Sequence, residues 1–183
     1  MAEPITFAHK PTLTGERVEL RPLGPEHVDA SMAALAEPAS IRLTGTHATF
    51  TREQIEHWHA TRAEQADRLD FAIVETATDT VVGDLAITEL NPDNRSCGYR
   101  IAIIEAAVGR GLGTEATRLV LDYVFGLGLH RIDLEVYDFN PRARHVYEKV
   151  GFVYEGTQRD ALRWDGDWVD AHVMSILETD PRP

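Results

Sequence analysis

Cysteine is almost absent from this chain of 183 residues, in which Cys97 is the single example. An internal disulfide and a thiolate metal cluster are both excluded, because each needs more than one cysteine. The eight histidines show no spacing typical of a metal site, and His57 and His59 would diverge on a helix. The sequence therefore predicts no bound metal.

Long apolar runs and an excess of basic charge are also missing. No stretch approaches the roughly 18 to 20 uninterrupted apolar residues of a membrane helix, and the N-terminus lacks the features of a signal peptide. The formal net charge is −12, with 18 Lys and Arg against 30 Asp and Glu. Because nucleic acids and anionic membranes are bound by basic surfaces, we expect a cytoplasmic protein that binds neither and whose field favours cationic partners.

The apolar content of 43% in a chain of this length predicts one substantial core and is too small for two typical domains. No internal repeat or low-complexity linker interrupts the pattern. We expect an N-terminal tail over residues 1–14, a single domain over 15–178 and a C-terminal tail over 179–183.

Alternating strand and helix patterns predict an α/β (α+β) fold with a central mixed, twisted sheet and helices on both faces. Within the helix at 114–126, an apolar stripe includes Ala116, Val120 and Leu127, and we expect Leu121, Phe125, Phe139 and Val150 to pack in the core. Strands are expected at 17–22, 71–75, 81–90, 96–103, 131–136, 152–159 and 168–177; helices are expected from Pro25, from the capping box Thr51-x-x-Gln54 toward Asp70, at 114–126 and at 141–150.

Three alternating glycines, Gly109, Gly111 and Gly113, end an apolar strand-like run and open an amphipathic helix. Glycine tolerates positive φ and lets a ligand approach the main chain. The first turn of a helix carries unpaired N–H groups and the positive end of the helix dipole. This arrangement predicts a site for an anion, most naturally a phosphate.

These glycines allow three other interpretations. Gly111-x-Gly113-x-x-Ala116 matches a dinucleotide-binding fingerprint, with Asp133 and Glu135 near the distance of a ribose-binding acid, but few strand and helix units follow it. The other phosphate loop requires a terminal Gly-Lys-Ser/Thr, and here Thr114 follows Gly113 directly. A glycine-rich turn without a ligand is the third interpretation.

A second motif, Asn140-Pro-Arg-Ala143-Arg-His-Val146-Tyr147-Glu-Lys-Val-Gly-Phe152, favours a more specific interpretation. Together the two motifs resemble the GNAT superfamily of acetyl-coenzyme A-dependent N-acetyltransferases, with Val146 in place of the usual leucine. The segment 16–23, Gly98-Tyr99, Glu155-Gly156-Thr157 and Gly166-x-Trp168-x-Asp170 resemble the branch of ribosomal-protein N-terminal acetyltransferases. The resemblance covers about residues 15–178.

This resemblance implies a GNAT-like fold and acetyl-CoA as cosubstrate, with the glycine loop around its pyrophosphate. Val108 stands where the family usually has Gln or Arg, so one polar partner of the phosphate is lost, while backbone donors remain. Arg144 is a further cation within the motifs. The residues expected to contact the coenzyme are Ile103, Val108, Gly109, Arg110, Gly111, Leu112, Gly113, Thr114, Asn140, Arg142, Ala143 and Tyr147.

The resemblance also implies the catalytic groups. Tyr147 would stabilise the departing thiolate, and Asn140 would bond the pantetheine arm or order water, or else simply end a strand. The family often places a carboxylate base where this chain has Ser96. Glu89 and Glu105 are the nearest alternatives, and a water chain is equally admissible.

The implied function is transfer of an acetyl group to a primary amine, which could belong to a protein N-terminus, a polyamine or an antibiotic. A non-catalytic acyl-CoA-binding module is the alternative, because Ser96 and Val108 stand where the family places functional side chains. A homodimer is compatible with the sequence. For Trp164 and Trp168, an acceptor cleft, the core and a dimer contact all remain open.

Overall fold

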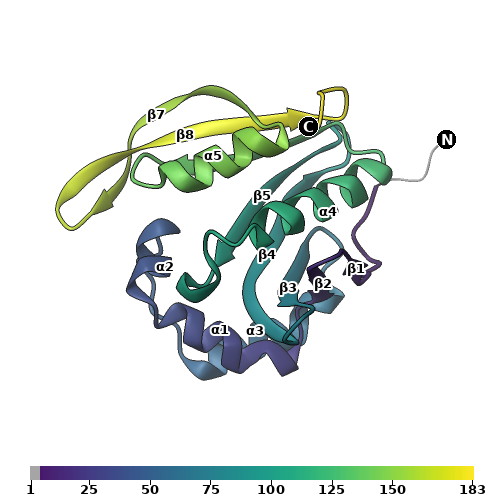
Figure 1. The fold of residues 1–183 in the computed structure, drawn as a ribbon, viewed down its shortest axis with the longest axis vertical. Coiled ribbons are helices and arrows are strands. Elements are labelled where there is room, and N and C mark those ends of the chain that lie inside the picture. The colour runs from purple at the N-terminus through teal and green to yellow at the C-terminus, as the bar shows by residue number, and fades with distance from the viewer. Residues whose placement is uncertain (1–4) are drawn as a thin grey trace.

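The computed structural model describes residues 5–183, whose backbone is organised around one mixed sheet of eight strands (Figure 1). The β5–β6 pair is parallel, and the other neighbouring pairs are antiparallel. The sheet is therefore the mixed one expected from the sequence. In spatial order the strands are β1 (Leu13–Thr14), β2 (Val18–Pro22), β3 (Leu69–Glu75), β4 (Thr80–Asn91), β5 (Ser96–Ile103), β6 (Arg131–Tyr137), β8 (Asp167–Leu177) and β7 (Val153–Trp164).

The helices cover both faces of this sheet. Neighbouring residues of a strand point to opposite faces. On β5 the Tyr99 hydroxyl bonds to the longest helix, while Arg100 lies close enough to Arg62, which follows the third helix, for their charges to interact. In Figure 1 the first three helices gather at one end of the molecule, below β4. The helices are α1 (Val28–Leu35), α2 (Pro38–Leu43), α3 (Arg52–Thr61), α4 (Leu112–Gly126) and α5 (Pro141–Val150), with short 3-10 turns η1 (Pro25–His27), η2 (Arg62–Glu64) and η3 (Glu105–Ala107).

The start of α3 is confirmed and its expected end is wrong. Thr51 Oγ1 accepts from the Gln54 N–H at 3.2 Å, and Gln54 Oε1 accepts from the Thr51 N–H at 2.8 Å. The helix then stops at Thr61 instead of continuing toward Asp70. Leu69 and Asp70 already belong to β3, where they pair with Ile87 and Ala86, because the sheet ladder buries Leu69 completely. The short α2 was not predicted at all.

The core lies between the sheet and α4. Phe71, Ile73 and Leu85 of the sheet are buried, as are Ala116, Val120 and Val124 along the expected stripe of α4. Leu121, expected separately in the core, is also buried. Val150 is also buried, and Phe125 packs at the core's edge, as predicted. Phe139 is only half-buried, and Leu127 is exposed because it follows the last turn of α4. The apolar stripe therefore holds α4 firmly and leaves its N-terminal turn free for the site.

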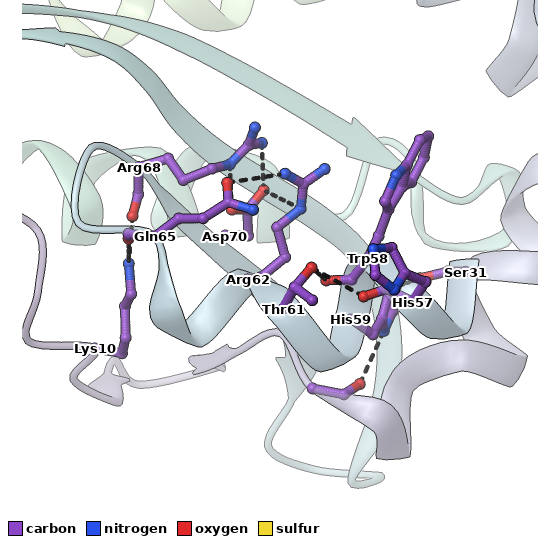
Figure 2. Close-up of polar contacts among 11 residues, drawn as sticks. Lys10, Ser31, His57, Trp58, His59, Thr61, Arg62, Gln65, Arg68 and Asp70 are labelled. Atoms are coloured by element: carbon purple, nitrogen blue, oxygen red, sulfur yellow. Dashed lines mark hydrogen bonds and ion pairs between the residues drawn. The ribbon is translucent and has the colours of Figure 1, made fainter. Parts of the chain in front are cut away.

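The expected N-terminal tail is bound to the domain over residues 7–14 and does not extend freely from it. Phe7 is 1% exposed, and its N–H donates to the Ala66 carbonyl at 2.7 Å. Lys10 Nζ donates to the carbonyls of Gln65 and Arg68, each at 2.5 Å (Figure 2). Residues 1–4 of the expected tail lie outside the described part. The expected C-terminal tail also has contacts, because the Pro183 carbonyl accepts from Arg118 at 3.1 Å.

A polar network fixes α3 against the rest of the molecule (Figure 2). The Nδ1 atom of buried His59 lies 2.8 Å from the Gly24 carbonyl, and its Nε2 lies 3.2 Å from Ser31 Oγ. Arg68 makes two bonds to the Asp70 carboxylate, at 2.6 and 2.7 Å. His57 is exposed on another face of the helix, so the two histidines diverge as expected.

Two further observations concern the described residues as a whole. Across residues 5–183, no group of three or more His, Cys, Asp and Glu side chains is arranged to hold a metal ion. None of the helices in this part of the chain combines the length and the apolar character needed to cross a membrane.

Candidate active site

The candidate site lies where β5 and β6 separate. The two strands pair from Ser96 to Gly98 on β5 and from Arg131 to Asp133 on β6, and beyond these residues they no longer bond. Residues 99–103 and 134–137 therefore continue as the two arms of a fork. A cavity of about 690 Å³ occupies the fork and is lined by residues from both arms, from the glycine loop and from α5.

The glycine loop closes one end of this cavity with backbone donors. Gly109 and Gly111 adopt φ values of 78° and 80°, and Gly111 is the N-cap of α4 without any side-chain cap. Within residues 5–183, none of the N–H groups from Gly109 to Thr114 donates to a protein acceptor. Unpaired N–H groups at a helix N-terminus form a site for an anion, so this end of the cavity fits a diphosphate.

The loop residues differ in where their side chains lie. Val108, Gly109, Gly111, Leu112, Gly113 and Thr114 all line the cavity, together with Ile103. Arg110 does not line it, because its guanidinium turns away and forms an ion pair with Glu75 of β3. Arg142 does line the cavity, whereas Arg144 bonds Glu148 at 3.1 Å. Of the three arginines, Arg142 alone places its side chain at the cavity.

Arg17 contacts the glycine loop, although the sequence indicated no role for it. Its Nη2 donates to the Arg110 carbonyl at 2.5 Å, and its N–H donates to Glu115 Oε1 at 2.8 Å. These partners lie 93 and 98 positions further along the chain. No local pattern could have indicated such a contact, because it exists only once β2 packs beside α4.

Tyr147 lines the cavity from α5 and is 6% exposed. Its ring meets Tyr99 edge-on with centroids 6.1 Å apart, and Phe152 at 5.8 Å. Burial raises the pKa of the Tyr147 phenol above its ordinary value. No hydrogen bond to its hydroxyl is present among the described residues, so the neutral phenol is available as a donor to a group in the cavity.

Asn140 both caps a helix and lines the cavity. Its side-chain oxygen accepts from the Ala143 N–H at 3.2 Å and caps α5, whose first residue is Pro141. Asn140 and Ala143 also line the cavity. The side-chain oxygen is used by the cap, which leaves the amide NH2 group as the part of Asn140 that can bond a ligand.

The two candidate carboxylates lie in different places. Glu89 lines the cavity at a β-bulge of β4, and its φ of 55° is in the left-handed region. A Cβ at Gly98, where the fork begins, would lie 3.2 Å from Glu89 Oε2. Glu105 lies outside this cavity on η3, where its N–H donates to Glu37 Oε2 at 3.1 Å.

Neither Ser96 nor Cys97 offers a substitute base at the fork. Ser96 is not among the residues that line the cavity. Cys97 is 2% exposed, and burial raises the pKa of its thiol to about 12, so it stays neutral. Two further acids do line the cavity, Asp133 and Glu135 of β6, which the sequence analysis considered only for a dinucleotide site. Their place follows from the fork, which no sequence pattern revealed.

The far wall of the cavity is formed by the last residue of α2 and the residues that follow it. Leu43, Thr44 and Thr46 line it, and the neighbouring His47 stacks on Trp164 of β7 with ring centroids 5.2 Å apart. The tip of the β7–β8 hairpin thus touches the α2 segment. Trp164 is placed near this wall, whereas Trp168 is 61% exposed and Trp58 packs on Phe50 at 4.8 Å.

Comparison with known proteins identifies the family. The acetyltransferase (GNAT) domain matches residues 17–153, most of the chain. This chain belongs to the GNAT acetyltransferase family. Spermidine N(1)-acetyltransferase of Vibrio cholerae is 35% identical over 108 residues, which cover 58% of this chain and 62% of that protein. YdaF of Bacillus subtilis, named as a candidate ribosomal N-acetyltransferase, is 30% identical over 100 residues, or 54% of this chain and 55% of its own length.

The GNAT fold is equally clear among solved structures. Spermidine N-acetyltransferase of Vibrio cholerae in complex with CoA and spermine superposes with a TM-score of 0.83, covering 90% of this chain and 98% of that one. Its sequence identity is 24%, so this likeness concerns the fold. The mixed sheet and the GNAT fold expected from the sequence are both confirmed.

Proposed function

We propose that this GNAT domain transfers the acetyl group of acetyl-CoA to a primary amine of a small polycationic molecule, the polyamines being the leading class. One observation carries the proposal. A single cavity has unpaired backbone N–H groups from Gly109 to Thr114 at one end and the Tyr147 phenol and Glu89 carboxylate on its walls. These are the groups that an anionic donor and an amine acceptor require.

The donor would be held by main-chain groups more than by side chains. The N–H groups of the glycine loop would bind the diphosphate, and the α4 dipole favours its charge. Val108 offers no polar group, while Arg142 adds a cation at the cavity wall. The Asn140 amide would bond the pantetheine arm. Bound acetyl-CoA supplies an activated acetyl thioester.

The chemistry is an attack of a neutral amine on the thioester carbonyl. A bond forms between the amine nitrogen and the carbonyl carbon, and the carbon–sulfur bond breaks as the thiolate leaves. Glu89, directly or through water, would accept the proton that the amine loses. Tyr147 would donate a hydrogen bond to the charge that develops on sulfur. Full proton transfer from this phenol is disfavoured, because burial raises its pKa further above that of a thiol.

The acceptor class follows from charge. Glu89, Asp133 and Glu135 line the same cavity, as do Arg100, Arg142 and Lys149. Asp133 is paired with Arg131 at 3.3 Å, whereas Glu89 and Glu135 form no ion pair within residues 5–183, and the whole chain carries a net charge of −12. A molecule with several ammonium groups could present one deprotonated amine to the thioester while its other charges face these carboxylates. The name of the Vibrio cholerae relative, a spermidine acetyltransferase, supports this class.

A thiol-release assay with acetyl-CoA tests the proposal. Spermidine, a peptide with a free N-terminus and an aminoglycoside are compared as acceptors, and mass spectrometry identifies each acetylated product. We expect the polyamine to have the highest kcat/KM and to lose much of its advantage in Glu89→Gln. Equal rates for an uncharged monoamine, or no thiol release with any amine, would contradict the proposal. The comparisons give no support to a non-catalytic acyl-CoA-binding module.

A further inference from the structure

The phosphate loop is held from outside by a residue that does not line the cavity. Arg17 lies in the bend just before β2, and its guanidinium donates to the Arg110 carbonyl at 2.5 Å. Its Nη1 would lie 3.1 Å from a Cβ at Gly111, so the guanidinium reaches the outer side of the loop. Arg17 is not among the residues that line the cavity.

The direction of one peptide group links this contact to the ligand. The C=O and N–H of a trans peptide point in opposite directions, and no cis peptide bond occurs in the described residues. The carbonyl of Arg110 and the N–H of Gly111 belong to the same peptide. Because Arg17 holds the carbonyl outward, the Gly111 N–H points away from Arg17, on a residue that lines the cavity.

A second contact ties Arg17 to the first turn of α4. Its backbone N–H donates to Glu115 Oε1 at 2.8 Å. A Cβ at Gly15, in the preceding turn, would collide with the same Glu115 carboxylate and displace it. Through Arg17, β2 therefore touches both the loop and the helix that follows it.

We propose that Arg17 is a positioning residue for the phosphate site: it fixes and polarises the Arg110–Gly111 peptide so that the Gly111 N–H is aimed at the diphosphate of the coenzyme. A charge-assisted hydrogen bond orients the carbonyl and draws electron density toward it, which makes the N–H a stronger donor. The side chain of Arg110 is held in an ion pair with Glu75, so it leaves the space beside its own carbonyl to the Arg17 guanidinium.

The proposal rests on the proposed use of acetyl-CoA, and Arg17→Met tests it by removing the guanidinium while keeping most of the chain length. We expect the Kd for CoA, measured by calorimetry, to rise about five- to tenfold, as loss of one exposed charged hydrogen bond implies. KM for acetyl-CoA should rise equally, with kcat changed less than about twofold. Arg17→Lys should restore part of the affinity.

Two comparisons separate this role from a merely structural one. Arg21→Met is the matched control on the adjoining strand β2, because Arg21 pairs with Glu19 and Asp79 away from the loop. The CoA affinity of this variant should be unchanged. S-acetylpantetheine, which lacks the diphosphate, should be used equally well by the wild-type protein and by Arg17→Met.

The outcomes are distinguishable. A CoA affinity within about twofold of the wild type in Arg17→Met overturns the positioning role. So does an equal loss of kcat/KM with acetyl-CoA and with S-acetylpantetheine, because the effect would then not act through the phosphates. Failure of the wild-type protein itself to bind CoA would instead defeat the proposed function.

Discussion

The hydroxyl of Thr117 joins the phenol of Tyr99 to the first turn of α4. Thr117 Oγ1 donates to the Gly113 carbonyl at 2.7 Å and lies 2.7 Å from Tyr99 Oη, so Tyr99 donates to Thr117. Both side chains are buried, and burial raises the pKa of the Tyr99 phenol well above its ordinary value. The arm of β5 and the base of the phosphate loop are therefore connected by hydrogen bonds inside the core.

This connection predicts unequal effects of two substitutions. Tyr99→Phe removes one neutral hydrogen bond and should lower the free energy of unfolding by about 1 kcal/mol. Thr117→Val keeps the shape but leaves the Tyr99 hydroxyl buried without its acceptor, at a cost of about 1 to 3 kcal/mol. Urea unfolding measures both values. The double variant should be less destabilised than the sum of the single ones, and full additivity would contradict the connection.

Tyr147→Phe should lower kcat about ten- to a thousandfold, because it removes a hydrogen bond that is needed mainly as charge develops on sulfur. The Kd for CoA should stay within about twofold of the wild type, since the ring still packs on Tyr99 and Phe152. Steady-state kinetics and calorimetry measure the two quantities. An unchanged kcat would refute the role of this phenol.

Ionisation of Tyr147 should not lower the rate at any pH below about 10, which is the ordinary pKa of a phenol. Burial disfavours the phenolate, so the pKa is raised and the hydrogen-bond donor persists as pH increases. With subsaturating amine, the rate should rise about tenfold per pH unit from about 7 to 9 as the acceptor loses its proton. A falling limb near pH 8 that disappears in Tyr147→Phe would show that the phenol ionises earlier.

His27 should make the protein less stable in mild acid. Its Nδ1 accepts from the Gly24 N–H at 3.1 Å, and burial is the main cause that lowers its pKa below the ordinary 6.5. The unfolded chain therefore takes up the proton first, so stability is present above pH 6.5 and falls as pH drops toward the lower folded-state pKa. The urea midpoint should drop between about pH 7.5 and 5.5, and it should drop less in His27→Gln.

The exposed His57 gives the control for that experiment, because His57→Gln should retain the full acid sensitivity. Glu155 does not account for a loss of stability in this pH range, because it takes up its proton at a lower pH. Hydrogen bonds from Arg131 and Ser175 lower its pKa from 4.5 to about 2, so its contribution is lost only as pH falls through that interval. Identical pH dependence in the wild type and in His27→Gln would contradict the assignment to His27.

Gly111→Ala should weaken CoA binding more than Gly109→Ala. Both residues have positive φ, which costs an alanine about 1 to 2 kcal/mol. A Cβ at Gly109 would meet no atom within 4 Å, whereas one at Gly111 would lie 3.1 Å from the Arg17 guanidinium. Calorimetry with CoA compares the two variants. A larger loss in Gly109→Ala would show that the outer side of Gly111 does not matter.

Much of the fold could be predicted because its signals are local. The apolar stripe of α4, the capping box at Thr51 and the cap of α5 at Asn140 each depend on residues within a few positions of one another. The end of α3 was wrong for the opposite reason. Leu69 continues an apolar pattern along the chain, but its burial is decided by pairing with Ile87 in β4.

The site could be predicted where a motif carries it and not where the topology assembles it. The glycine loop and Tyr147 line one cavity, and their roles toward the coenzyme stay predictions. Arg17 reaches the loop, 93 positions away, only after β2 has packed beside α4, and Glu75 draws Arg110 away from the cavity across 35 positions. Such long-range pairs leave no periodic trace in the sequence.

In the fork between β5 and β6, one end of the two strands holds the sheet together and the other end lines the cavity. At the closed end, from Ser96 to Gly98, the two strands are joined by the hydrogen bonds of the sheet. The open arms form no hydrogen bonds with each other. Arm side chains that line the cavity without entering the core, such as Glu135, can therefore be exchanged at little cost in stability, whereas Tyr99, Leu134 and Val136 are buried and serve the core as well. A change of selectivity is tolerated most easily at the exposed positions of the open arms.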